Sequence, residues 1–207
     1  MCELGRVDVL YETSILSQYL AQPRIGHIKQ AINIFGYLER HSRTWLVLDP
    51  TLFDVRWVPQ SNEESPERRA ELMKHLYPDA DKPTPPGMPS PRGNSVDINV
   101  FVDADHAGNK ITRRSHTGII IYINSAPIIW FSKRQNNVES ATFGSEFIAL
   151  KTALDLVEGL TYKLKMLGIP ISGPARIFCD NDAVVRSGSF PEVVLKKKTL
   201  SIVFHRI

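Results

Sequence analysis

The sequence has 207 residues, of which 43% are hydrophobic and 23% are charged, and its formal net charge is +3. This composition is typical of a soluble globular protein with one large domain or two small ones. No apolar run approaches the length of a membrane span, which excludes a membrane-spanning chain. The cysteines are Cys2 and Cys179. We therefore expect no disulfide framework, and a reducing intracellular compartment, either cytoplasm or nucleus. The mildly basic charge permits a nucleic-acid partner without requiring one.

The first part of the chain, residues 1–80, is predicted to be mainly helical. Apolar side chains recur at helical spacing on both sides of Pro23, so two helices are expected to form a hairpin. A third helix is predicted where Ser65 can cap it and Pro66 can occupy its first position. The predicted helices span residues 12–22, 24–41 and 65–76, and short strands are predicted at 44–50 and 53–59.

A proline-rich segment, residues 81–95, separates this part from the rest of the chain. It contains five prolines and two glycines, which disfavour both a helix and a central strand. We interpret it as a linker to a second domain at residues 96–207.

The second domain alternates strands and helices. Strands are predicted at 97–105, 116–123, 127–134 and 175–181, and helices at 145–167 and 181–188. An order of three strands, helix, strand and helix predicts an α/β domain with a mixed sheet. The last strand is expected to lie parallel to one of the first three, because the long helix provides the crossover connection.

Three acidic residues lie at comparable positions in these elements. Asp103 is near the end of the first strand, Glu146 opens the long helix, and Asp180 ends the strand that follows. In open α/β sheets, the carboxyl ends of strands and the neighbouring helix starts meet at one crevice. Three carboxylates there would repel one another unless cations lie among them, and Mg²⁺ prefers oxygen ligands. Two such ions about 4 Å apart can support phosphodiester cleavage.

Each acid taken alone has an ordinary structural explanation, such as a strand end, a helix cap or a favourable helix dipole. Only the ordered set of three, together with a family resemblance carried by the surrounding motifs, favours a function. Asp105 follows Asp103 by two positions, so strand alternation directs both acids to the face opposite Val102. Polar and basic residues that could contact a nucleic-acid backbone are Arg113, Arg114, Ser115, Lys133, Arg134 and Asn181.

The motifs VDADHAG, TRRSHTGIIIYINSAPIIWFSKRQ, SEFIAL and IFCDNDAVV occur in this order. They resemble the ribonuclease H domain of copia-type retrotransposon polyproteins, which has SDADWAG-like, TRKSTSGY-like, PISWSSKKQ-like, EAEYMAL-like and CDNQSA-like segments. The resemblance begins near Asn99. The upstream segment GRVDVLYETSILSQYLAQPRIGHIKQAINIFGYLERH is similar to the end of the copia-type reverse transcriptase, so residues 1–80 are expected to be a thumb or connection remnant.

The resemblance implies a ribonuclease H-like mixed sheet with flanking helices, preceded by a small mainly helical segment. It assigns Asp103, Glu146 and Asp180 as the catalytic and metal-binding residues, and places Asp105 at the rim. The implied enzyme is a ribonuclease H-type endonuclease that uses two Mg²⁺ ions, or Mn²⁺, to hydrolyse the RNA strand of RNA–DNA hybrids. Its implied partners are the hybrid and the remainder of the retroelement polymerase, with no membrane.

Two departures from the family pattern bear on activity. The family's fourth acid lies in a later helix, and residues 96–207 are expected to be a C-terminally truncated domain that ends before it. With three acids and without the fourth, one of the two metal ions is expected to bind weakly. The rate of RNA cleavage is therefore expected to fall steeply. A polymerase YxDD motif is absent from this sequence, which excludes polymerase activity of this chain. Two other hypotheses stay open, namely a catalytically inactive nucleic-acid-binding module and a structural remnant of a retrotransposon polymerase.

Overall fold

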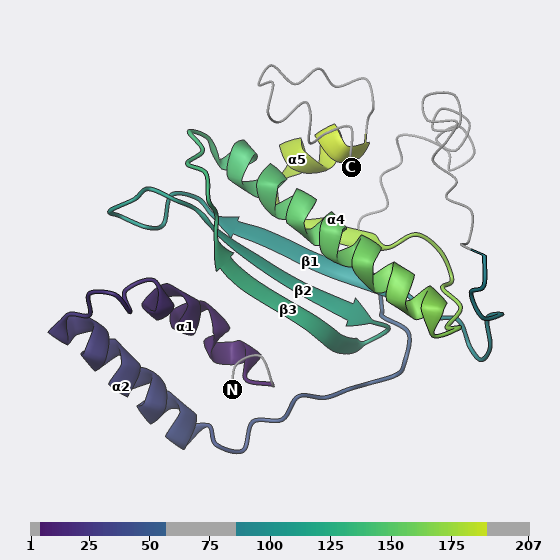
Figure 1. Ribbon diagram of the computed structural model, residues 1–207, viewed down its shortest axis with the longest axis horizontal. Coiled ribbons are helices and arrows are strands. Elements are labelled where there is room, and N and C mark those ends of the chain that lie inside the picture. Colours follow the sequence, from purple (N-terminus) through teal and green to yellow (C-terminus); the bar gives the residue numbers. More distant parts are fainter. Residues whose placement is uncertain (1–4, 57–85, 190–207) are drawn as a thin grey trace.

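The computed structural model, drawn in Figure 1, describes residues 5–56 and 86–189. The first described part contains the short 3-10 helix η2 (Val7–Val9) and the helices α1 (Leu10–Ser17) and α2 (Ile25–Arg40). The second contains β1 (Ile98–Asp105), β2 (His116–Ile123), β3 (Ala126–Arg134), α4 (Thr142–Met166), β4 (Arg176–Cys179) and α5 (Asp182–Ser189). This order confirms the predicted succession of three strands, helix, strand and helix.

The four strands form one mixed sheet in the order β3-β2-β1-β4. β1 and β2 are antiparallel, as are β2 and β3, whereas β4 lies parallel to β1. The parallel pair is reached through α4, which is the crossover helix that the sequence predicts. The structure therefore confirms an α/β fold with a mixed sheet.

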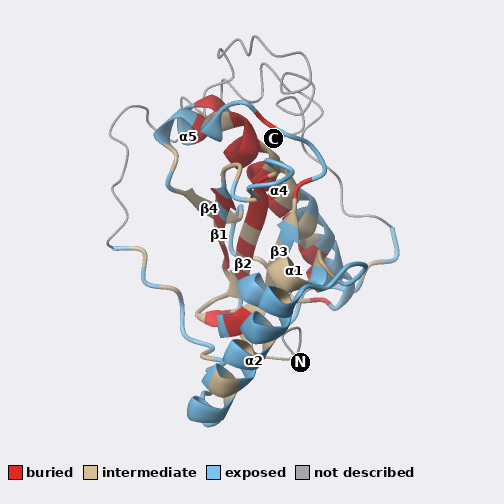
Figure 2. Cartoon of the chain, turned by 90° about the vertical axis from the view of Figure 1, so that its left-hand side faces the viewer, coloured by how far each residue is buried: buried red, intermediate tan, exposed pale blue. Residues whose placement is uncertain are grey.

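α4 lies across one face of the sheet and buries the hydrophobic core there (Figures 1 and 2). The strands contribute Val100, Val102, Ile119 and Ile121, and Phe147 is the largest fully buried side chain of α4. Burying an aliphatic or aromatic side chain of this size stabilises the fold by about 1.5–3 kcal/mol. The alternation of buried and exposed residues along β1 places Asp103 and Asp105 on the face opposite this core, as predicted.

The opposite face of the sheet is covered in part by residues 5–56. The Phe53 ring lies 5.7 Å from Phe101, 5.7 Å from Tyr122 and 6.5 Å from Phe178, measured between ring centroids. Phe101 and Phe178 stack on each other at 4.9 Å, on neighbouring parallel strands. α1 packs against β3 (Figure 1). Residues upstream of the predicted linker thus complete the packing of the second domain.

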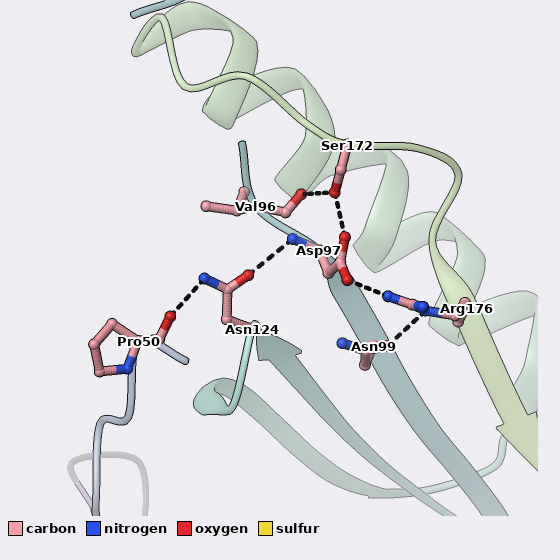
Figure 3. A network of polar contacts seen from close by, with 7 residues as sticks. All are labelled: Pro50, Val96, Asp97, Asn99, Asn124, Ser172 and Arg176. Carbon is pink, nitrogen blue, oxygen red and sulfur yellow. Dashed lines mark hydrogen bonds and ion pairs between the residues drawn. The ribbon is translucent and has the colours of Figure 1, made fainter. Parts of the chain in front are cut away.

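A polar network joins the beginnings of β1 and β4, at the end of the sheet away from Asp103 (Figure 3). Arg176 pairs with Asp97 and donates to Asn99 Oδ1 at 3.0 Å, and Ser172 also donates to Asp97. Asn124 accepts a hydrogen bond from the backbone N–H of Asp97 and donates to the carbonyl of Pro50, both at 2.9 Å. These contacts attach the N-terminal segment to the turn between β2 and β3.

The predictions of short strands at 44–50 and 53–59 are wrong for the described residues, which extend to residue 56. This segment forms no ladder with the described strands. One backbone hydrogen bond, from Ser125 to the carbonyl of Thr51, connects it to the sheet. Its continuous apolar run is therefore not evidence of strand pairing, and Trp45 remains 83% exposed.

Other boundaries differ by a few residues. α1 ends at Ser17, five residues before the predicted end, and residues 18–21 form a turn. The physical reason lies in the backbone, where the N–H groups of Gln18 and Tyr19 bond to the carbonyls of Ile15 and Leu16, three residues back, and tighten the last turn. α4 begins at Thr142, three residues earlier than predicted. The predicted helix at 65–76 lies outside the described residues.

Residues 86–95 of the predicted linker contain neither helix nor strand. Among the described residues, none of the helices combines the length and the apolarity needed to cross a bilayer.

Candidate metal centre

The three predicted acids meet where β1 and β4 end and α4 begins. Cys179, the last residue of β4, is the register partner of Val102, so Asp180 and Asp103 follow directly on two adjacent parallel strands. Glu146 lies near the start of α4, which covers these strand ends. The connection through α4, which makes β4 a parallel neighbour of β1, therefore brings together acids that are far apart in the sequence.

The tightest cluster of possible ligand atoms in the described part of the chain belongs to Glu146, Cys179 and Asp180. One atom from each lies within 4.8 Å of the other two. Asp103 is not in this cluster, but its charge raises the pKa of Glu146 more than the charge of Asp180 does. The structure thus places Asp103 within electrostatic reach of Glu146.

Glu146 is the buried member of the site. It is 3% exposed, and its Oε2 has no hydrogen-bond donor among the residues that the structure describes. Burial first, and then the charges of Asp103 and Asp180, raise the pKa of Glu146 to about 7, against a lowering effect of a hydrogen bond from the Ala104 backbone. A buried carboxylate oxygen without a donor is costly, and a cation placed among the acids is one way to compensate it.

The two other acids are exposed. Asp103 Oδ1 accepts a hydrogen bond of 2.7 Å from the backbone N–H of Ala104, which orients the carboxylate at the end of β1. Asp180 directly follows β4 and is also exposed. A cation or a phosphate group could approach these two carboxylates from solvent while Glu146 remains covered.

The thiol of Cys179 lies beside the acids but does not fit the same ligand. Burial, followed by the charges of Glu146, Asp180 and Asp103, raises the pKa of the thiol, so it stays protonated at neutral pH. Its side chain packs against the hydrophobic core. Sulfur is a soft ligand, whereas Mg²⁺ and Mn²⁺ prefer oxygen. The carboxylates therefore fit a hard divalent ion, and Cys179 forms the apolar wall of the site.

Buried polar side chains next to Glu146 support the start of α4. Gln135 Nε2 donates to the carbonyl of Ser145 at 2.8 Å and to Thr117 Oγ1 at 3.0 Å. Ser145 Oγ donates to the carbonyl of Thr142 at 2.8 Å and lies 3.2 Å from His106 Nδ1. Since the Ser145 hydroxyl has already given its proton, His106 Nδ1 is the donor in this contact. No periodic pattern in the sequence joins Gln135 to Ser145, so only the fold reveals their support of α4.

A further acid, Glu139, lies against the first turn of α4. A Cβ atom at Gly144 would be 2.5 Å from Glu139 Oε2, so this carboxylate occupies space that only glycine leaves open. A negative charge near the start of a helix interacts favourably with the helix dipole. Glu139 is therefore a second acid at the start of α4, beside Glu146, and no sequence motif marks it.

The predicted nucleic-acid contacts are dispersed around the site. Arg113 is exposed and Arg114 half-buried in the loop between β1 and β2, residues 106–115. Ser115 is 0% exposed, and its hydroxyl accepts the backbone N–H of Ala107 at 3.1 Å. In this structure Ser115 supports the loop instead of facing solvent.

The other three predicted contacts lie on separate elements. Lys133 is exposed on β3, while the neighbouring Arg134 donates to Gln18 Oε1 at 3.1 Å. Asn181 caps α5, because its Oδ1 accepts the backbone N–H of Val184 at 3.2 Å. Arg134 and Asn181 thus have structural contacts within the chain.

Fold and site together define an α/β domain with a carboxylate cluster at the carboxyl ends of two parallel strands. Two curated relatives from Arabidopsis thaliana are similar to the chain, the retrovirus-related Pol polyproteins from transposons RE1 and RE2. They are 29% and 28% identical over 116 residues, which is 56% of this chain. The chain spans only 8% of the length of each polyprotein. These matches support a retrotransposon polyprotein origin.

A third relative is the secreted RxLR effector protein 161 of Plasmopara viticola. It is 29% identical over 79 residues, which cover 38% of this chain and 56% of that protein. No family model matches the chain. No solved structure matches it either.

Proposed function

We propose that this chain carries a ribonuclease H-like domain of a copia-type retroelement polyprotein, and that it hydrolyses the RNA strand of RNA–DNA hybrids. Asp103, Glu146 and Asp180 are the proposed ligands of two Mg²⁺ ions, for which Mn²⁺ can substitute. The observation that carries the proposal is the buried Oε2 of Glu146, which has no donor among the described residues and lies within electrostatic reach of two exposed acids.

The chemistry of the ligand atoms supports a hard divalent ion at this site. All three proposed ligands offer carboxylate oxygens, and the one buried group is the one whose ionisation is most penalised. A dicationic ligand would reverse that penalty, because an opposite charge nearby favours the charged form of an acid. The neighbouring thiol of Cys179 is protonated and apolar, so it does not compete for the ion.

The residues have separate tasks in the proposed reaction. Divalent ions bound by such acids supply an activated water and stabilise the leaving oxygen of a phosphodiester. Asp103 and Asp180 face solvent, where a scissile phosphate can reach them. Glu146 holds its charge on the covered side of the site. The exposed Arg113 is proposed to bind a backbone phosphate.

Recognition of the hybrid is proposed to depend on backbone shape and 2′-hydroxyl groups and not on base sequence. The proposed partners are the RNA–DNA hybrid and the remainder of the retroelement polymerase. The proposed location is intracellular, in the cytoplasm or nucleus, where the free Cys179 would stay reduced.

The test is cleavage of a labelled RNA–DNA hybrid by the 207-residue chain. Cleavage is expected with Mg²⁺, and none with a chelator or in Asp103→Asn, Glu146→Gln or Asp180→Asn. The matched control is Glu39→Gln, the same kind of change on the exposed side of α2, which is expected to leave the rate unchanged. Hybrid binding without cleavage would replace the proposal with an inactive nucleic-acid-binding module. Absence of binding would replace it with a structural segment.

A further inference from the structure

Three polar residues on one side of α1 and its C-cap meet the sheet. Tyr11, Ser14 and Gln18 are three and four positions apart, which places them on the same side of a helix. We call them the α1 stripe. Their contacts reach residues 91 to 118 positions further along the chain. The α1 stripe therefore joins the N-terminal part to the α/β domain.

The first contact of the stripe engages Asp105. Tyr11 Oη donates to Asp105 Oδ2 at 2.9 Å. A Cβ atom at Gly108 would lie 1.8 Å from the same oxygen, so the carboxylate is folded over the glycine backbone. Asp105 is therefore held between Gly108 and α1, although it is only two residues from Asp103. The DADHAG segment thus carries one acid for the candidate metal centre and another for the interface.

The second contact involves His116, which lies opposite Asp105 in the register of β1 and β2. Ser14 Oγ donates to the carbonyl of Ser132 at 2.9 Å and lies 3.0 Å from His116 Nε2. Because the Ser14 hydroxyl has given its proton to that carbonyl, it accepts from an Nε2–H of His116. The edge of the imidazole also meets the Tyr11 ring, with centroids 5.2 Å apart at 78°.

The third contact reaches the loop between β1 and β2. Gln18 Oε1 accepts a hydrogen bond of 3.1 Å from Asn109 Nδ2 and another of 3.1 Å from Arg134 Nη1. One amide oxygen therefore ties the loop to the end of β3.

Asn109 is the organising residue of that loop. Its Oδ1 accepts the backbone N–H groups of Ile111 and Thr112 at 3.1 and 2.9 Å. Its own N–H donates to the carbonyl of Arg114, and its carbonyl accepts the N–H of Arg113 at 2.7 Å. Arg113 has a φ of 55°, a left-handed conformation that is costly outside glycine and needs such support.

We infer that α1 is a docking element for the α/β domain, and that Gln18 and Tyr11 are positioning residues for loop 106–115. The loop keeps its shape because Gln18 immobilises Asn109 from outside the loop. The N-terminal part therefore controls the conformation of the loop that carries Arg113 and Arg114. This inference depends only on contacts between described residues, so it holds or fails independently of the proposed nuclease activity.

The test is hydrogen exchange measured by mass spectrometry on the full chain, without nucleic acid or metal. In Gln18→Met, which keeps the length of the side chain, peptides covering loop 106–115 are expected to exchange about fivefold to tenfold faster, the effect of losing a hydrogen bond of ordinary strength. Peptides from the buried part of α4 are expected to keep the wild-type rate. Tyr11→Phe removes a single oxygen and is expected to speed exchange in α1.

The matched control is Gln30→Met, the same change at an exposed position of α2, which is expected to leave all peptides unchanged. Unchanged exchange of the loop in Gln18→Met, or an equal acceleration in the loop and in α4, would overturn the inference. If Gln18→Met lowers global stability, Tyr11→Phe provides the test, since it leaves the packing of the ring intact. Faster exchange in α1 with wild-type exchange in the buried part of α4 would support docking, and unchanged exchange in α1 would overturn it.

Discussion

Cys179 on β4 is the register partner of Val102 on β1, and the next residue of each strand is an aspartate. This pairing brings Asp180 and Asp103 to the same end of the sheet. The ionisation of Glu146, a buried residue of α4, is opposed by these two negative charges. The contribution of Asp180 depends on the register of β4, because a displacement by one residue would turn its side chain to the other face of the sheet.

Glu146→Gln is expected to stabilise the metal-free protein at pH 8. The folded-state pKa of Glu146 is raised to about 7 from an ordinary value of 4.5, so the fold prefers the protonated acid. The native state therefore loses stability as the pH rises from 4.5 through 7. Replacing the acid with a neutral amide should raise the free energy of unfolding by on the order of 1 kcal/mol at pH 8. Urea unfolding at pH 5 and pH 8 measures this, and a gain at pH 5 equal to that at pH 8 would contradict it.

Binding of Mg²⁺ to the wild-type chain is expected to release a proton near neutral pH. A cation needs ionised Glu146, so the apparent affinity should rise up to about tenfold per pH unit below pH 7 and level off above it. Calorimetric titrations in two buffers of different ionisation enthalpy count the protons released. Glu146→Gln should abolish the pH dependence, and an affinity that does not vary between pH 6 and pH 8 would contradict the role of this acid.

Acid pH is expected to weaken the docking of α1. Burial lowers the pKa of His116 below its ordinary value of 6.5, against the raising effect of Asp105, and Arg134 lowers it further. The fold thus prefers neutral His116. Its contribution is complete above pH 6.5 and is lost as the pH falls from 6.5 toward the folded-state pKa, by at most about 1.4 kcal/mol per pH unit. Urea unfolding at pH 7.5 and pH 5.5 should show a smaller difference in His116→Gln than in the wild type. An equal difference in the two proteins would rule out the effect.

Gly108→Ala is expected to destabilise the protein by about 1–3 kcal/mol, because the new methyl group would displace the carboxylate of Asp105 and break its bond to Tyr11. The matched control is Gly159→Ala on the exposed side of α4, where a Cβ meets no atom within 4 Å. That change should stabilise the helix by about 0.5–1 kcal/mol. Thermal unfolding of both variants measures the contrast, and equal shifts in the two would contradict the steric explanation.

The sequence by itself determined the elements of the α/β domain. Alternation along residues 98–105 encodes a half-buried strand, and the recurring apolar residues of α4 encode a helix that must cover a sheet, because both patterns are local and periodic. The spacing of the strands and the long helix also implied the parallel crossover. Because that crossover fixes which strand ends meet, the order of the elements alone was enough to assign the three acids to one end of the sheet.

Only the tertiary structure decided which groups touch. The docking of Tyr11 on Asp105 and of Gln18 on Asn109 joins positions 94 and 91 residues apart, and no periodic pattern reports such contacts. The apolar run at 44–50 was predicted to be a strand because propensity is local, whereas pairing requires a free strand edge in the right place. The burial of Glu146 beside Cys179 likewise follows from the packing of α4 on the sheet. Distance in space, and not order in the chain, sets both its pKa and its capacity to hold a cation.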